Sequence, residues 1–507
     1  MSDLEFLFVL LIAAAILVRV ADLIRVPFPI VLVLAGLGIG FVPGLPDVNL
    51  DPDVVFLVFL PPLLCRAAFQ ASPQELRLEA GPLGWLALGV VLATIGSVAV
   101  VAHAVVDGLG WAEAFVLGAV VAPTDPVAAL AAFSRVRAPE RVRLLVEGES
   151  MINDASALVA FGVAVGVATG DTFSVGDALL DFVVSVIGGL AIGLAIARVQ
   201  RLILERLSDR PLSILWTLLT AYAQYIAAEK AGVSGVLAVV VGGIYLGWHS
   251  STVFDADVRL SATAFWETLD FALNALIFIL LGLQFPALTA DLPVGDVLGP
   301  GLAIAGVVIV VRLALQFMPW AGTGESWGER VVVGWSGMRG AISLAAALSI
   351  PLDVAGRDQL IVLTFVVILV TLVGQGLTLP PLLKMLALPE TRTWSPEEAV
   401  ARLEAAQAAL ERLEEIEDEF DGELPEPVKR LQEIYRTRFR VCQAILSGER
   451  ENRERIADGR LRFGALRREL IGVERESLLE LRSAGQLRPE TLRAIERDLD
   501  LEEARLR

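Results

Sequence analysis

Long apolar runs separated by short polar segments make up the first 390 residues of the chain. A helix needs about 17–25 apolar residues to cross a bilayer, and fewer where it is broken. Thirteen runs meet this requirement, near residues 4–20, 26–43, 53–70, 82–106, 112–133, 144–168, 176–204, 211–229, 233–248, 262–285, 297–318, 329–350 and 359–387. Two pairs of runs are separated only by short polar stretches, so twelve or fourteen spans also fit the pattern. We therefore expect an all-α polytopic membrane protein with about thirteen transmembrane helices.

Basic residues concentrate in alternate loops between these runs. The loops that follow odd-numbered runs carry the arginines Arg19, Arg25, Arg77, Arg135, Arg137, Arg141, Arg143, Arg259 and Arg330, and four more surround the end of the seventh run, Arg198, Arg201, Arg206 and Arg210. The loops that follow even-numbered runs carry mostly aspartate and glutamate. Because cytoplasmic loops are rich in Arg and Lys, the alternation predicts an external amino terminus and a cytoplasmic tail in a cell membrane. The formal net charge of −18 argues against nucleic acid as a partner, since that partner requires a basic surface.

The composition changes near Trp394 to one dominated by Glu, Arg, Leu and Ala. We place a transmembrane domain over residues 1–390 and a helical cytoplasmic domain over residues 391–507. Apolar residues recur at helical spacing after Pro396, which predicts that a helix begins there. Further helices are expected over 428–447, 450–482 and 488–506. The tail either stabilises or dimerises the protein or binds a regulatory ligand, and the charge pattern leaves both roles open.

Two carboxylates and several neutral oxygens lie in the sixth apolar run. A charge inside a bilayer costs roughly 2.5–3.5 kcal/mol on insertion scales, so Glu149 and Asp154 should each have an oppositely charged partner or a functional role. Ser150 and Asp154 are four residues apart and share a helix face, and Asn153 lies beside the acid. A single carboxylate among neutral oxygens is suited to holding a small cation or a proton. The pattern therefore predicts an ion site at Asp154.

The fifth run is interrupted by Pro123-Thr124-Asp125-Pro126. Each proline removes a backbone donor and clashes with the preceding turn. Within a bilayer, a broken helix persists only where its freed carbonyls line a cavity or contact protein. Thr124 and Asp125 lie at this break, which predicts an ion site formed by unwound backbone together with a carboxylate.

The twelfth run contains Gly334, Gly337 and Gly340 around a single arginine, Arg339. An unpaired arginine at this depth is costly, so a carboxylate should face it. Glu149 is the best candidate, and we predict a structural salt bridge between Glu149 and Arg339.

The two interrupted runs are the fifth and the twelfth, so they cross the membrane in opposite directions. A matched pair of broken helices indicates a secondary transporter built from inverted repeats. We expect two inverted repeats of six helices, formed by runs one to six and eight to thirteen and joined by run seven.

These motifs resemble those of the monovalent cation:proton antiporters of the sodium/proton exchanger type. The motifs are Thr124-Asp125-Pro126, Gly148-Glu149-Ser150 with Asn153-Asp154, and Gly337-Met338-Arg339-Gly340. Further matching stretches are Phe59 to Leu64, Phe265 to Asp270, Gly282 to Gln284 and Gly374 to Thr378, and the tail looks like that of bacterial members. The resemblance covers the whole chain and rests on several motifs in a fixed order.

The resemblance implies a role for each polar residue near the breaks. Asp154 would bind the transported cation and the proton in turn, and Asn153 would stabilise the site. Ser150 and the backbone of Thr124 would supply oxygens, and Asp125 would complete the broken crossing. A homodimer that needs no cofactor is implied, with Na⁺ as the first candidate cation and Li⁺ or K⁺ as alternatives.

Competition at one carboxylate is the mechanism that the sequence favours. Desolvation favours the protonated form of a buried acid and a bound cation favours its ionised form, so the two ligands exclude each other at Asp154. Asn153 stands where a second acid would otherwise add charge, which predicts electroneutral exchange. A tail-regulated channel is an alternative, but the sequence shows no selectivity-filter motif. An intramembrane aspartyl protease using Asp125 and Asp154 is disfavoured by the nearby Asn153 and Arg339.

The third and tenth runs carry further polar residues. Arg66 lies shortly after two prolines, where members of the resembled family often have an acid, and it could line or close a funnel at the cytoplasmic end. Glu267, Asp270 and Asn274 share one face of the tenth run. These three residues either line a funnel or form hydrogen bonds between helices.

Overall fold

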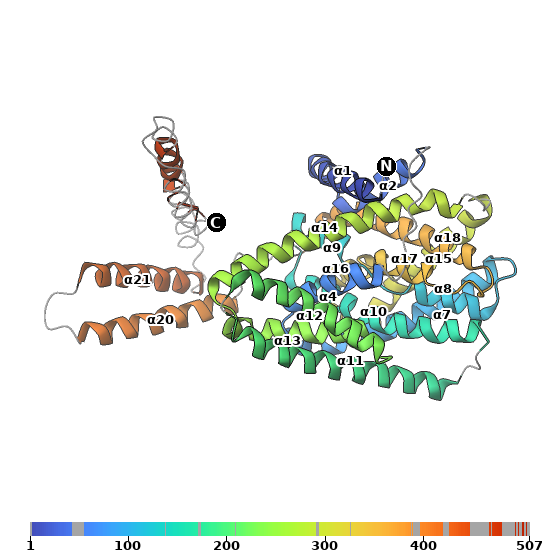
Figure 1. The fold of residues 1–507 in the computed structure, drawn as a ribbon, viewed down its shortest axis with the longest axis horizontal. Coiled ribbons are helices and arrows are strands. Elements are labelled where there is room, and N and C mark those ends of the chain that lie inside the picture. Colours follow the sequence, from blue (N-terminus) through green and yellow to red (C-terminus); the bar gives the residue numbers. More distant parts are fainter. Residues whose placement is uncertain are drawn as a thin grey trace. The chain divides into compact units, whose positions relative to one another are not determined.

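A computed structural model describes residues 3–42, 55–136, 138–170, 174–207, 209–289, 294–324, 326–386, 388, 396–418 and 425–446, with short pieces at 466–467 and 469–478 and single positions at 492, 495, 499, 500 and 503. The regular elements in these residues are helical (Figure 1). This confirms the predicted all-α class for the part of the chain that the structure describes.

The elements of the first half are α1 (Asp3–Ile24), α2 (Phe28–Gly40), the π-helical turn η1 (Val55–Phe59), α4 (Leu60–Gln70), α5 (Pro73–Leu78), α6 (Ala80–Gly84), η2 (Trp85–Val90), α7 (Val91–Val105), α8 (Trp111–Val120), α9 (Val127–Val136), α10 (Glu140–Ala168), α11 (Val175–Leu204) and α12 (Arg210–Lys230). Those of the second half are α13 (Gly235–Val253), α14 (Ala256–Thr289), α15 (Val294–Gln316), α16 (Trp327–Trp335), α17 (Ala341–Leu348), α18 (Arg357–Leu369), η3 (Val370–Gln375), α19 (Gly376–Leu386), α20 (Pro396–Asp418) and α21 (Glu426–Leu446).

Each of the thirteen predicted runs coincides with a helix or with consecutive helices. Seven helices in the described part of the chain are long and apolar enough to cross a membrane, and the segments Phe28–Gly40, Val55–Gln70, Trp111–Val120 and Val127–Val136 are shorter apolar helices. The π-helical turns η2 and η3 lie inside continuous helices, Ala80–Val105 and Arg357–Leu386. The chain is thus a multi-pass membrane protein.

Short polar residues set the starts of several of these helices. The side chains of Ser174, Asp209, Ser234 and Ser326 each accept a hydrogen bond from a backbone N–H in the first turn of α11, α12, α13 and α16. Such caps satisfy one of the four N–H groups that a helix start leaves unpaired. They place the helix ends at the polar boundaries between the apolar runs.

The membrane helices form two bundles within Met1–Glu390. Helices α1, α2, α4 and α11–α14 pack mainly on one another and are called the first bundle (Figure 1). Helices α7–α10 and α15–α19 likewise pack mainly on one another and are called the second bundle. Helix α10 also contacts α4, α11 and α13, so it lies where the two bundles meet.

The residues Thr391–Arg507 form a separate compact unit. Helices α20 and α21 pack along each other as a hairpin, with Gln432 Nε2 donating to Glu417 Oε2 at 2.8 Å. They correspond to the predicted helix after Pro396 and the predicted helix over 428–447. The helices expected over 450–482 and 488–506 lie largely outside the described residues.

Candidate ion-binding site

Two interrupted helices meet at the centre of the second bundle. The chain is not helical between α8 and α9, from residue 121 to 126, or between α16 and α17, from residue 336 to 340. The backbone N–H of Asp125 donates to the carbonyl oxygen of Met338 at 2.8 Å, so the two breaks lie against each other. The breaks predicted from the prolines of the fifth run and the glycines of the twelfth are confirmed.

Charged side chains compensate the helix ends that these breaks expose. Arg339 Nη1 donates to the carbonyl oxygen of Pro123 at 3.1 Å, close to the carboxyl end of α8. Asp125 Oδ1 accepts from the N–H of Val127 at 2.9 Å, and the Asp125 side chain also accepts from the N–H of Ala341. Asp125 therefore lies at the amino ends of both α9 and α17. A helix carries a partial negative charge at its carboxyl end and a partial positive charge at its amino end. The cationic Arg339 and the anionic Asp125 each lie at a helix end of opposite partial charge.

Glycine at position 340 is required by this close contact. A Cβ atom at Gly340 would overlap the Oδ2 atom and the Cβ atom of Asp125. The glycine thus lets the Asp125 carboxylate reach the start of α17, which is why the residue types at the two breaks depend on each other.

Helix α10 brings the predicted oxygen ligands to the first break. Ser150 Oγ donates to the carbonyl oxygen of Thr124 at 2.8 Å, and Asn153 Nδ2 donates to Thr124 Oγ1 at 2.6 Å. Asp154 lies one residue further along and has no exposed surface. The structure therefore brings Thr124, Asp125, Ser150, Asn153 and Asp154 close together, with Ser150 and Asp154 on one face of α10 as their spacing predicted.

The Asp154 carboxylate has no hydrogen-bond partner in the described part of the chain. Both of its oxygens are buried, and neither accepts a hydrogen bond. Asn153 Oδ1 is also buried without a donor. Burying a carboxylate without a partner is costly unless it takes up a proton or a cation. Asp154 thus lies where a proton or a cation would stabilise it, and the adjacent Asn153 also carries a buried oxygen without a donor.

A cavity of about 500 Å³ leads to Asp154 and is called the central cavity. Along α10 it is lined by Arg143, Glu147, Ser150 and Asp154, which lie on one helix face and span roughly 16 Å at 1.5 Å per residue. Arg143 is exposed, Glu147 is partly buried, and Ser150 and Asp154 are buried. The cavity therefore opens at the amino end of α10 and closes at Asp154.

The walls of the central cavity come from both bundles. The second bundle contributes α9, α10, α17 and the break at residues 121–126, and the first contributes α2, α4 and α14. Glu267, Asp270 and Asn274 of α14 line it, as the funnel alternative for the tenth run required. Asp270 also accepts a hydrogen bond from Arg66 of α4, so the alternative of hydrogen bonds between helices holds for this residue as well. Asn274 Nδ2 donates to the carbonyl oxygen of Asp270, one turn earlier in the same helix, at 2.9 Å.

The predicted partner of Glu149 was wrong. Glu149 forms its salt bridge with Arg312 of α15, not with Arg339. Arg312 Nη2 donates to Glu149 Oε2 at 2.7 Å, Arg312 Nη1 donates to Glu149 Oε1, and Arg312 Nε donates to the carbonyl oxygen of Gly334 at 3.0 Å. Glu149 and Asp154 are five positions apart on α10, so their side chains point to different sides of the helix.

Sequence reasoning missed Arg312 although a signal was present. It is an arginine near the end of the eleventh apolar run, and such a residue needs a partner as much as Arg339 does. A Cβ atom at Gly337 would overlap Arg312 Nε, so one of the glycines predicted to surround Arg339 in fact makes room for Arg312. Arg339 contacts the Pro123 carbonyl instead and interacts electrostatically with Asp154 without a hydrogen bond to it.

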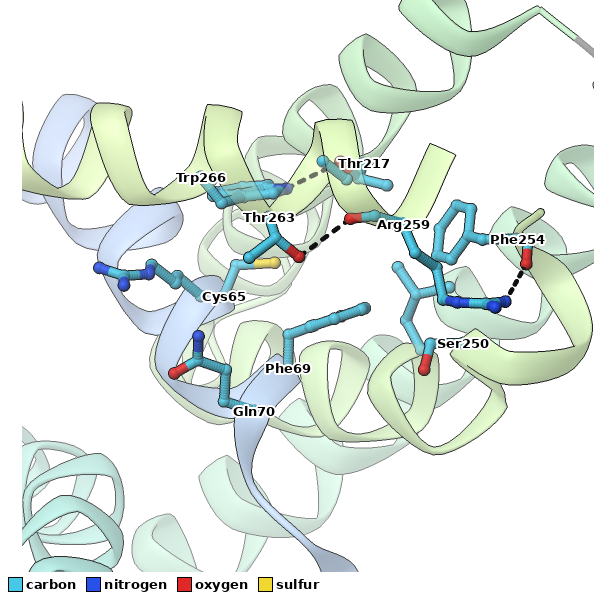
Figure 2. Close-up of a pocket in the computed structure, with 12 residues that line it drawn as sticks. Cys65, Phe69, Gln70, Thr217, Ser250, Phe254, Arg259, Thr263 and Trp266 are labelled. Carbon is cyan, nitrogen blue, oxygen red and sulfur yellow. Dashed lines mark hydrogen bonds between the residues drawn. The ribbon is translucent and has the colours of Figure 1, made fainter. Parts of the chain in front are cut away.

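A smaller cavity of about 140 Å³ lies between α4, α12, α13 and α14 and is called the side cavity (Figure 2). Trp266 Nε1 donates to Thr217 Oγ1 at 3.2 Å, Thr263 Oγ1 donates to the carbonyl oxygen of Arg259 at 2.9 Å, and Arg259 Nη1 donates to the carbonyl oxygen of Phe254. The residues that line the side cavity include two arginines and no carboxylate. The side cavity therefore does not compete with Asp154 as a cation site.

Comparison with known proteins gives a consistent family and fold. A family model described as "Sodium/hydrogen exchanger, transmembrane" matches residues 7–385. The Na(+)/H(+) antiporter ApNhaP of Aphanothece halophytica is 33% identical over 433 residues, which cover 81% of this chain and 80% of that protein. The low-affinity Na(+)/H(+) antiporter NhaS1 of Synechocystis sp. is 33% identical over 450 residues, which cover 85% of this chain and 84% of that protein.

A solved structure has the same fold. The sodium proton antiporter MjNhaP1 from Methanocaldococcus jannaschii matches with a TM-score of 0.62 at 23% sequence identity. The match covers 76% of this chain and 98% of that chain.

Proposed function

This chain belongs to the sodium/hydrogen exchanger family, and we propose that it exchanges a monovalent cation, Na⁺ first, for H⁺ by competition of both ions at Asp154. It is a transporter and not an enzyme. The relatives named as Na(+)/H(+) antiporters cover most of its length, which supports the exchange of these two ions.

The observation that carries the proposal is the state of the Asp154 carboxylate. It is buried at the inner end of an open cavity, and neither oxygen has a partner in the described residues. A carboxylate in this position is stable when protonated or when it binds a cation, and it cannot do both at once. Proton and cation thus exclude each other without separate binding sites.

Neutral oxygens around Asp154 complete the proposed cation site. Asn153 Oδ1 has no donor, and the Thr124 carbonyl accepts only the Ser150 hydroxyl among the described hydrogen bonds. Asp125 supports the site by holding the two helix breaks together. Oxygens of this kind replace the water shell of a small hard cation such as Na⁺.

The two bundles supply a means of alternating access. Asp154 belongs to the second bundle, and the wall across the central cavity belongs to the first. Movement of one bundle against the other would close the cavity on one side of Asp154 and open it on the other. If only the protonated or the cation-loaded carboxyl allows this movement, exchange is coupled. With one acid and a neutral Asn153 at the site, one charge moves in each direction.

The remaining assignments follow the charge pattern and the composition. The proposed topology has an external amino terminus and a cytoplasmic tail, so the central cavity opens toward the cytoplasm through the amino end of α10. We assign a transmembrane antiporter domain to residues 1–390 and a cytoplasmic helical domain to residues 391–507. The proposed assembly is a homodimer without a cofactor, and the tail has either a stabilising or a ligand-sensing role.

Flux into proteoliposomes tests the proposal. Purified protein should move protons when Na⁺ is added, with Li⁺ and K⁺ tested separately and the membrane potential clamped. Asp154→Asn should abolish this flux and leave the protein monodisperse in detergent. Asp353→Asn, which removes an exposed acid in the loop between α17 and α18, is the matched control and should retain the flux.

Two outcomes would contradict the assignment. Cation-driven proton movement that persists in Asp154→Asn would remove Asp154 from the mechanism. Cation flux that runs without proton movement in the opposite direction would favour the channel alternative.

A further inference from the structure

Arg66 carries a positive charge into the wall of the central cavity. Its Nη1 atom donates to Oδ2 of Asp270, and the two side chains are 23% and 25% exposed. The pair joins α4 to α14 within the first bundle. Arg66 lines the central cavity on one side and the side cavity on the other, so its guanidinium lies at the boundary between the two.

The way in which Arg66 is held differs from that of the structural arginine Arg312. The Arg312 guanidinium contacts both oxygens of Glu149 and two backbone carbonyl oxygens, and it is almost fully buried. Arg66 donates through Nη1 to one oxygen of Asp270, and its buried Nε has no acceptor among the described residues. Arg66 is therefore tethered at one corner, and its charge is only partly neutralised.

The charge of Arg66 acts across the boundary between the bundles. Glu147 lies on α10 two helical turns before Asp154 and lines the same cavity. Its carboxylate interacts electrostatically with Arg143 and with Arg66. Arg143 is exposed at the mouth of the cavity, whereas Arg66 is partly buried in its wall. Any cation that approaches Asp154 through this cavity therefore passes the field of Arg66.

The central cavity contains both acidic and basic side chains, and their balance determines how strongly it attracts a cation. Its carboxylates are Asp125, Glu147, Asp154, Glu267 and Asp270, and its cations are Arg66 and Arg143. The carboxylates attract a transported cation, and a resident guanidinium opposes that attraction. We propose that Arg66 is a tethered cation that competes electrostatically with the transported cation, and that the Arg66–Asp270 pair thereby sets the apparent affinity for that cation.

Asp270 has a defined part in this arrangement. By pairing with Arg66 it holds the guanidinium against α14 and neutralises part of its charge. Removal of Asp270 would leave the full charge of Arg66 facing Glu147 and the route to Asp154. The two members of the pair should thus have opposite effects on cation affinity, although they share one contact. This inference rests on the proposed cation exchange and adds the groups that tune it.

The experiment measures Na⁺-dependent proton flux in proteoliposomes for four proteins. Arg66→Gln should lower the KM for Na⁺ on the order of five-fold, and Asp270→Asn should raise it by about the same factor, as expected for one unit charge in a partly hydrated site. The double variant should return close to the wild-type KM. Arg66→Lys keeps the charge and should stay nearer to the wild type than Arg66→Gln. The maximal rate should change less than the KM.

A purely structural role for the pair gives a different result. In that case both single variants lose the same link between α4 and α14, so the KM for Na⁺ should shift in the same direction in both. The KM of the double variant should then lie no closer to the wild-type value than that of either single variant. This result would overturn the proposal. An unchanged KM in both single variants would overturn it as well. If Arg66→Gln does not yield folded protein, the comparison of Asp270→Asn with the double variant decides alone, because only the electrostatic role predicts restoration.

The wild-type measurement separates this inference from the proposed function. Absence of exchange in the wild-type protein would contradict the function itself. Exchange in the wild type together with single variants that shift in the same direction would contradict only the role of Arg66.

Discussion

Glu149 of α10 and Arg312 of α15 form a salt bridge in which the two side chains are 1% and 2% exposed. Two nitrogens of the guanidinium contact the two carboxylate oxygens, and the remaining donors contact the carbonyl oxygens of Gly334 and Val333. The pair therefore joins α10, α15 and the last turn of α16. It fixes the helix that carries Asp154 relative to the break in the twelfth run.

Replacement of Arg312 by methionine should destabilise the protein strongly. The change leaves the Glu149 carboxylate buried without a partner, and loss of one member of a buried pair typically costs about 3–5 kcal/mol. We expect a clearly lower melting temperature of the detergent-solubilised protein. The double variant Glu149→Met with Arg312→Met removes both charges and should regain part of this stability.

Arg339→Met is the matched comparison for Arg312→Met. It removes the donor to the Pro123 carbonyl but leaves the Glu149–Arg312 pair in place, so its melting temperature should fall less. A larger loss in Arg339→Met than in Arg312→Met would show that Arg339 and not Arg312 is the partner on which Glu149 depends.

Gly340→Ala should impair exchange by disturbing the contact between the two breaks. The added Cβ atom would overlap the Asp125 carboxylate, so Asp125 would lose its place at the start of α17. We expect a loss of transport of at least about ten-fold, since small displacements at a binding site have effects of this size. Flux in proteoliposomes gives the rate, and a melting curve shows whether the protein remains folded.

Gly306→Ala is the control for Gly340→Ala, because it makes the same change from glycine to alanine at a position with free space. A Cβ atom at Gly306 in α15 meets no atom within 4 Å. Alanine is the better helix former by roughly 1 kcal/mol, so this variant should be as active and at least as stable as the wild type. Equal activity of the two alanine variants would contradict the proposed tight contact at Gly340.

Ser150→Ala tests the oxygen ligands beside Asp154. The change removes the hydroxyl that donates to the Thr124 carbonyl at 2.8 Å, so the unwound segment would be held less firmly. We expect a several-fold higher KM for the cation, because one hydrogen bond contributes about 1 kcal/mol. Ser349→Ala is the control, since Ser349 Oγ donates to the carbonyl oxygen of Ala346 at the end of α17 that lies away from the break. A KM equal to that of the wild type in Ser150→Ala would exclude this role.

The sequence predicted the helices and the breaks because both follow from local chemistry. The length of an apolar run determines where a membrane helix lies in the sequence. Pro123, Pro126 and the glycines around Arg339 interrupt their helices whichever neighbouring helices these pack against. The convergence of Ser150, Asn153 and Asp154 followed from helical spacing alone. These inferences require no knowledge of which helix lies beside which.

The partners of the charges could not be predicted in the same way. Pairing Glu149 with Arg312 rather than Arg339, or Arg66 with Asp270, depends on the rotation of each helix about its axis and on its neighbours. Run length and hydropathy give the depth of a residue in the membrane, but not the direction in which its side chain points. Arginines near the middle or the end of apolar runs were the available signal, and several acids could have satisfied each of them.

Competition at Asp154 makes a kinetic prediction that does not depend on substitutions. If proton and cation bind the same carboxylate, a lower pH should raise the apparent KM for Na⁺ and leave the maximal rate at saturating Na⁺ unchanged. In the range where the carboxyl without a bound cation is mostly protonated, the KM for Na⁺ should rise about ten-fold for each unit by which the pH is lowered, because one proton is displaced per cation. Initial rates over a grid of pH and Na⁺ concentration measure this relation. A KM that stays constant while the maximal rate falls would instead require a separate proton site, and Asp154 would then bind only one of the two ions.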